Sequence, residues 1–158
     1  MNKRFENYIE RLSPAKKILA KEAVTEFLCG EAEEVEIMQS AEMIFKKMRF
    51  LSAESEEKAY VILMKNNHRL IDVVKIADGG LDGTIVDVRK VLREALIKNA
   101  TCLAIVHNHP SGNSAPSRLD DNLTQCVRKA CETMRIHFTD HVIVAGNTYY
   151  SYREYGKL

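Results

Sequence analysis

The sequence lacks the features that would assign the chain to a membrane, to secretion or to a charged nucleic-acid surface. No stretch approaches the roughly 20 apolar residues that span a bilayer, and the opening MNKRFENYIE carries charges where a signal peptide has an apolar core. The 23 basic and 22 acidic residues nearly cancel, so no strong uniform field exists to concentrate the chain on nucleic acid. We therefore expect a cytoplasmic protein without general affinity for membranes or nucleic acids.

Cysteine is sparse, and no two cysteines form the C-x-x-C pair that would suggest a zinc or redox motif. Cys102 opens an apolar run that has the composition of a buried segment. In a cytoplasmic chain, reduced thiols in the core are the simplest interpretation. We therefore assign no chemistry to any of the four: Cys29, Cys102, Cys126 and Cys131.

What is present indicates a folded domain with an appendage. The content of 46% hydrophobic and 28% charged residues is ordinary for a globular protein and too apolar for a disordered chain. Residues 1–29 have helical apolar spacing, and an acidic run from Glu31 to Glu36 follows. We predict a helical N-terminal extension over 1–35 and a main domain over 36–158. The extension would allow a homodimer.

The main domain has the patterns of a mixed α/β sheet flanked by helices. Ser40 fits the N-cap of a first helix. The remaining predicted elements are a hairpin of strands 59–64 and 70–76, a helix over 88–96, a buried strand over 102–106, a long helix after Ser117 and a closing hairpin of 142–145 and 149–153. For the long helix, the predicted apolar face is Leu119, Leu123, Cys126, Val127, Ala130 and Met134.

The chemistry concentrates after the buried strand, in the string His107-Asn108-His109-Pro110. Strand side chains alternate faces, so His107 and His109 point the same way while Asn108 points the other. Asp120 falls in the first turn of the following helix and could return to the same point. Two histidines and one carboxylate leave a fourth position open, as in catalytic zinc sites.

A second interpretation of Asp120 needs no metal. Ser117 and Asp120 have the spacing of a capping box, in which the serine hydroxyl caps the helix and the acid at the third position bonds back to the serine backbone. Taken by itself, this capping interpretation is the stronger one for the pair. A lone H-x-H is also weak evidence for a metal.

The complete string is far more specific. His107-Asn108-His109-Pro110-Ser111-Gly112, followed by Ser117 and Asp120, resembles the JAMM signature of the JAB/MPN superfamily, and RadC-like proteins in particular. The resemblance covers roughly residues 38–158. It implies a JAB/MPN metalloprotease-like fold with a cytidine-deaminase-like layered architecture. The first 35 residues do not match the helix-hairpin-helix region of full-length RadC proteins.

The resemblance implies a metallopeptidase with one Zn²⁺ per chain, held by His107, His109 and Asp120. It implies a glutamate acid/base at the start of the first hairpin, which alignment places at Glu57, with Glu54 and Glu56 as neighbouring alternatives. Ser117 would donate a hydrogen bond to the developing oxyanion. The substrate would be a peptide or an isopeptide-linked protein, with a possible link to DNA repair.

Other assignments remain open. A catalytically weak or silent JAMM domain could act as a protein-interaction module. The remaining histidines, His68, His137 and His141, are expected to be structural or solvated, and an Asp140-His141 pair could support the core by hydrogen bonding. A barrel hydrolase needs about 250 residues, and a cupin has no place for the long helix.

Overall fold

The computed structural model describes residues 13, 14, 16–20, 35–79 and 86–158. By its contacts the chain divides into two units, Met1–Val35 and Glu36–Leu158. In the first unit, residues 16–20 are helical, and Ile18 and Leu19 are exposed. The rest of the helical pattern predicted over 1–29 lies outside the described residues.

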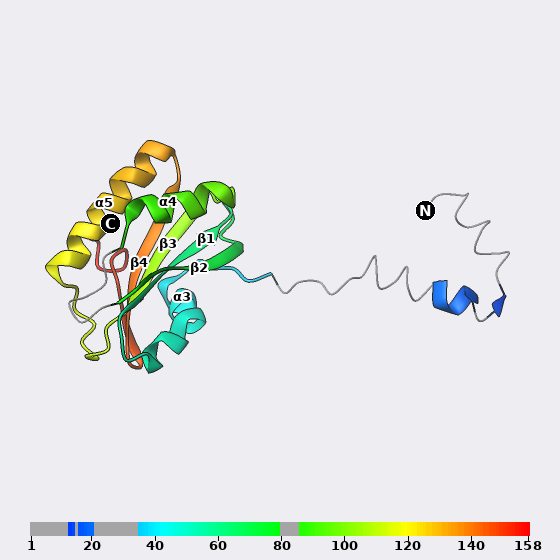
Figure 1. The fold of residues 1–158 in the computed structure, drawn as a ribbon, viewed down its shortest axis with the longest axis horizontal. Coiled ribbons are helices and arrows are strands. Elements are labelled where there is room, and N and C mark those ends of the chain that lie inside the picture. The colour runs from blue at the N-terminus through cyan, green and yellow to red at the C-terminus, as the bar shows by residue number, and fades with distance from the viewer. Residues whose placement is uncertain (1–12, 15, 21–34, 80–85) are drawn as a thin grey trace. The chain divides into compact units, whose positions relative to one another are not determined.

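The second unit contains one mixed sheet of five strands in the order β2-β1-β3-β4-β5 (Figure 1). Strand β3 lies at the centre, antiparallel to β1 and parallel to β4, and every residue of it is buried. Both hairpins, β1 with β2 and β4 with β5, are antiparallel. The strands are β1 Lys58–Met64, β2 Leu70–Asp78, β3 Cys102–Asn108, β4 His137–Ala145 and β5 Thr148–Ser151.

Helices cover both faces of the sheet (Figure 1). Helix α3 (Ala41–Met48) and the short 3-10 helix η1 (Arg49–Ala53) cover one face. Helices α4 (Val88–Ile97) and α5 (Arg118–Met134) cover the other. The predicted mixed α/β sheet flanked by helices is therefore confirmed. No helix in the described ranges is long and apolar enough to cross a bilayer.

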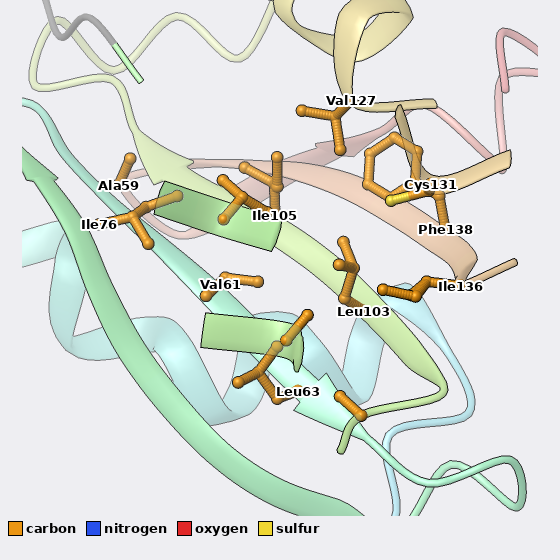
Figure 2. Packing of buried hydrophobic residues seen from close by; sticks show 13 residues of the cluster. Ala59, Val61, Leu63, Ile76, Leu103, Ile105, Val127, Cys131, Ile136 and Phe138 are labelled. Atoms are coloured by element: carbon orange, nitrogen blue, oxygen red, sulfur yellow. The ribbon is translucent and has the colours of Figure 1, made fainter. Parts of the chain in front are cut away.

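Alternation along the strands divides the interior into two cores. Figure 2 shows the core below α4 and α5, where Leu103 and Ile105 of β3 lie with Val127 of α5. The intervening β3 residues, Cys102, Ala104 and Val106, pack on the α3 side. Each fully buried aliphatic side chain contributes about 1.5–3 kcal/mol. Continuing the alternation places position 107 on the α5 face and position 108 on the α3 face.

Polar side chains define where the helices begin. The Ser40 hydroxyl accepts a hydrogen bond from the backbone N–H of Met43 at 3.2 Å, which confirms the predicted cap of α3. The Asp87 carboxylate accepts one from Arg89 N–H at the start of α4. These caps satisfy N–H groups that have no partner inside the helix.

The predicted apolar face of α5 is partly wrong. Leu119 is 73% exposed, Met134 is 42% exposed and Cys126 is also exposed. The fully buried positions of the helix are Thr124, Val127 and Cys131. A hydropathy pattern gives no weight to a buried threonine, so the predicted face was rotated away from the true one. The interpretation of Cys126 as a core thiol is wrong for the same reason.

Two further boundaries differ from prediction. Strand β4 begins at His137, five residues earlier than expected, because the polar run before Val142 is nevertheless buried from Phe138 onward. Strand β5 ends at Ser151, two residues before the predicted end, because residues 152–156 form turns.

Candidate metal centre

Three ligand atoms converge at the end of β3. The Nε2 atom of His107 lies 3.1 Å from Nε2 of His109 and 3.1 Å from an Asp120 carboxylate oxygen. The other Asp120 oxygen lies 3.5 Å from Nε2 of His109. One donor atom from each residue falls within 4.8 Å of the others, so the group could hold a metal ion. All three side chains are largely buried.

The end of β3 positions the two histidines, and the loop that leads into α5 positions Asp120. His107 lies near the end of β3 on the α5 face, and His109 follows the strand, its N–H donating to the Val144 carbonyl of β4 at 2.8 Å. The chain then turns at Gly112, whose φ of 76° favours glycine. This loop leads to Ser117 and the start of α5, which carries Asp120.

Asp120 completes a capping box and faces the histidines at the same time. Its carboxylate accepts hydrogen bonds from the Ser117 backbone N–H and from the Ser117 hydroxyl, both at 2.7 Å. The Asp120 N–H donates to the Ser117 oxygen at 3.2 Å. The two sequence interpretations of Asp120 are therefore compatible, because the cap fixes the carboxylate in the orientation that meets the histidines.

The electrostatics of the group favour a charged carboxylate. Burial by itself would raise the pKa of Asp120, but its close contacts with His107 and His109 hold that pKa far below its usual range. The hydrogen bond with Asp120 in turn raises the pKa of His109, against the opposing effect of burial. The region thus concentrates negative charge beside two imidazoles, as a cation site requires.

The far nitrogen of each imidazole also has a partner. Nδ1 of His109 lies 2.7 Å from the carbonyl oxygen of Asn113 in the loop. Nδ1 of His107 lies 2.9 Å from Nε2 of His141, and Nδ1 of His141 lies 2.6 Å from the Thr124 hydroxyl. Such outer partners orient metal-binding histidines.

The sequence did not predict that His141 contacts this group. It was expected to be structural or solvated, but it is fully buried and touches His107 directly. Complete burial holds the pKa of His141 well below its usual range. Extending the β4 alternation back from Val142 would have placed it on the α5 face. Asp140 accepts a hydrogen bond from the His141 backbone N–H, not from its ring.

The other two histidines lie elsewhere. His137 is exposed at the start of β4, and His68 occupies the β1–β2 connection with φ of 60°. Neither belongs to the group.

Glu57 is the acidic residue of its segment whose charge reaches His109. The pair Ala59 with His107 ends the β1–β3 ladder, and continuing that antiparallel register by two residues sets position 57 opposite 109. The negative charge of Glu57 is among the influences that raise the pKa of His109. Glu54, by contrast, forms an ion pair with Lys58.

The Asn108 side chain holds this segment in place. Its Oδ1 accepts from Lys58 N–H at 2.8 Å, and its Nδ2 donates to the Glu56 carbonyl at 3.0 Å. The amide therefore continues the hydrogen bonding of the ladder past the last strand pair. The Glu56 side chain itself is exposed, on the opposite alternation from Glu57.

Comparison with known proteins assigns the family. The family model described as RadC-like JAB domain matches residues 36–157. The chain belongs to the RadC-like JAB domain family. The JAB domain is also similar to curated relatives that carry the name UPF0758 protein. The one from Streptococcus gordonii is 36% identical over 118 residues, which is 75% of this chain and 52% of the relative.

Two other UPF0758 proteins give similar values. The Haemophilus ducreyi protein is 38% identical over 104 residues, covering 66% of this chain and 47% of its own length. The Streptococcus sanguinis protein is 37% identical over 119 residues, covering 75% and 52%. The chain thus spans about half the length of the curated relatives it matches. The resemblance noted from the His107–Asp120 string, and the JAB/MPN fold it implied, are confirmed.

Proposed function

We propose that this JAB domain is a zinc-dependent hydrolase of amide or isopeptide bonds. The observation that carries the proposal is the convergence of two imidazole nitrogens and one carboxylate oxygen within 4.8 Å. In addition, the negative charge of Glu57 is among the influences that raise the pKa of His109 in this group. The substrate class would be a peptide or an isopeptide-linked protein, as members of the JAB/MPN superfamily suggest.

The donor set fits zinc. Two imidazoles and one carboxylate are a ligand set of catalytic zinc, which keeps a further coordination position for water or substrate. In addition, each imidazole has a partner on its far nitrogen, which supports ring orientation. We therefore assign His107, His109 and Asp120 as the residues that would hold one Zn²⁺.

The chain's own groups would divide the remaining work. When bound, the zinc ion would supply Lewis acidity, which acidifies water and polarises a carbonyl. Glu57 would accept a proton from the attacking water and pass it to the leaving amine, which requires a carboxylate that is ionised at the start. Ser117 would donate a hydrogen bond to the oxygen on which negative charge develops.

Ser117 supports a second candidate function. Its hydroxyl donates to the Asp120 carboxylate, so it must leave that hydrogen bond before it can serve a substrate oxygen. If it stays, Ser117 only orients the metal ligand. A catalytically weak or silent domain that works as a protein-interaction module would have this arrangement.

A link to DNA repair, a cytoplasmic location and self-association through residues 1–35 are further proposals, which concern the whole protein.

The test combines metal content with hydrolysis. Elemental mass spectrometry should find about one zinc per chain in the wild type and in Glu57→Gln. Peptide and isopeptide-linked substrates should be cleaved by the wild type, not by Glu57→Gln, and at the wild-type rate by the matched control Glu56→Gln. Zinc binding with no cleavage of any substrate would favour the interaction module. A wild type that takes up no zinc would refute the proposal.

A further inference from the structure

A line of hydrogen bonds runs from the backbone of α5 to the first histidine of the metal group. The Thr124 hydroxyl lies 2.7 Å from the Asp120 carbonyl oxygen and 2.6 Å from Nδ1 of His141. Nε2 of His141 lies 2.9 Å from Nδ1 of His107. Thr124 and His141 are both fully buried. The line therefore joins a carbonyl of the helix to the far side of a metal-facing imidazole without water.

The chemistry of the groups gives this line one direction. A carbonyl oxygen only accepts, so the single hydrogen of the Thr124 hydroxyl is donated to Asp120 and its oxygen must accept from Nδ1–H of His141. In its neutral form the His141 imidazole carries one N–H, here on Nδ1, which leaves its Nε2 as an acceptor. His107 must then donate from Nδ1. Its lone pair is thereby left on Nε2, the atom that faces His109 and Asp120.

We infer that Thr124 and His141 are positioning residues that fix His107 in the tautomer whose Nε2 can bind a metal. The inference rests on the proposal that the group holds a metal. It goes beyond that proposal because it assigns a role to two residues that touch neither the metal position nor a substrate.

The opposite tautomer is a real competitor. With its hydrogen on Nε2, His107 would donate to the Asp120 oxygen 3.1 Å away and would be unable to bind a cation. The metal-free site thus offers a favourable hydrogen bond to the wrong tautomer. The Thr124 hydroxyl opposes this tautomer. If every hydrogen bond of the line were reversed, the Thr124 hydroxyl oxygen and the backbone carbonyl oxygen of Asp120 would face each other without a hydrogen between them.

His141 is also fixed as a ring. It stacks on Tyr152 with centroids 5.0 Å apart and planes 8° from parallel. The Tyr152 hydroxyl donates to the Asp121 carboxylate at 2.8 Å, which ties this ring to the first turn of α5. The imidazole therefore cannot turn away from His107 without breaking packing on its face.

The test uses Thr124→Val, which keeps the side-chain shape and removes the hydroxyl, with Thr124→Ser as the matched control that restores it. Nitrogen-15 NMR of the metal-free proteins reads the tautomer of His107 directly. Wild type and Thr124→Ser should carry the hydrogen on Nδ1, and Thr124→Val should shift it towards Nε2. Zinc affinity, measured by competition with a chelator, should fall roughly 10- to 100-fold in Thr124→Val and recover in Thr124→Ser.

An unchanged tautomer and zinc affinity in Thr124→Val would overturn the inference. If that variant does not fold, His141→Phe keeps an aromatic ring against Tyr152 and removes the acceptor, and an unchanged zinc affinity there would overturn it equally. The readouts separate this inference from the proposed hydrolase. A tautomer shift and affinity loss in a protein that cleaves nothing would sustain the positioning role while the hydrolase proposal fails.

Discussion

The two histidines of the metal group lie two residues apart, yet different parts of the molecule hold them. His107 belongs to the buried half, in which His141 of β4 contacts its far nitrogen and Thr124 of α5 contacts His141 in turn. His109 belongs to the loop half, in which the carbonyl of Asn113, four residues further along the chain, does so. The buried half depends on tertiary packing, whereas the loop half depends on local backbone geometry. Losses in the first should therefore reach the whole fold, and losses in the second should stay local.

Asp120 joins both halves, so its removal should have the largest effect. Asp120→Ala should abolish zinc binding and, through loss of the capping box, lower the free energy of unfolding by about 1 kcal/mol. Asp120→Asn keeps an acceptor for the Ser117 N–H and should lose zinc with a smaller loss of stability. Zinc content and urea unfolding in the presence of chelator measure the two effects. If Asp120→Ala retained zinc, Asp120 would be a helix-capping residue only and not a metal ligand.

The next comparison separates the halves directly. His107→Ala would leave Nε2 of buried His141 without its partner, which costs about 1–3 kcal/mol of stability. His109→Ala should lose zinc as completely but cost only about 0.5–1.5 kcal/mol, the net contribution of one hydrogen bond, because water can replace the ring at the exposed loop residue Asn113. Urea unfolding of the metal-free variants measures the difference. Equal losses would contradict the division into a buried and a loop half.

A backbone change should affect the loop half alone. Gly112 has φ of 76°, and an added Cβ would meet nothing within 4 Å, so Gly112→Ala introduces conformational strain only. Gly156, with φ of 66° and the same turn hydrogen bond to a carbonyl three residues back, is a matched control. Each alanine should cost roughly 1–2 kcal/mol. Zinc affinity should weaken for Gly112→Ala and stay unchanged for Gly156→Ala.

The smallest effect concerns two thiols of α5. Burial raises the pKa of Cys131 to about 11, whereas Cys126 is exposed. Iodoacetamide at pH 8 should therefore modify Cys126 and spare Cys131 until urea unfolds the protein, as peptide mass spectrometry can show. The pKa of the Cys131 thiol is higher in the folded chain than in the unfolded chain. The favourable contribution of this thiol to the free energy of unfolding is therefore complete at pH values below the unfolded pKa, and it is lost as the pH rises towards 11. Rapid labelling of folded Cys131 would show that the underside of α5 is open.

The sequence could predict those site residues that local spacing defines. Strand alternation placed His107 and His109 on one face, and the capping pattern placed Asp120 in the first turn of a helix. Both features depend on neighbours in the chain, so one sequence suffices to see them. The sequence placed the acid/base at Glu57 only through the family resemblance, with Glu54 and Glu56 as alternatives, whereas the pairing of β1 with β3 that sets position 57 opposite position 109 comes from the fold.

Thr124 and His141 escaped prediction because they are polar and fully buried. Hydropathy places such residues at the surface, and the energy that keeps them inside comes from hydrogen bonds between α5 and β4. For the same reason, the predicted apolar face of α5 was shifted and the predicted β4 was too short. The buried half of the site is thus the part that tertiary contacts decide.

The amide of Asn108 has a consequence for how such a site can diversify. It holds the stretch before β1 through the backbone N–H of Lys58 and the backbone carbonyl of Glu56, and backbone groups are the same for nearly every amino acid. Side chains around Glu57 can therefore be exchanged while the carboxylate keeps its place. In the proposed hydrolase, selectivity for one substrate over another could therefore be altered by mutation there while Glu57 stays in place.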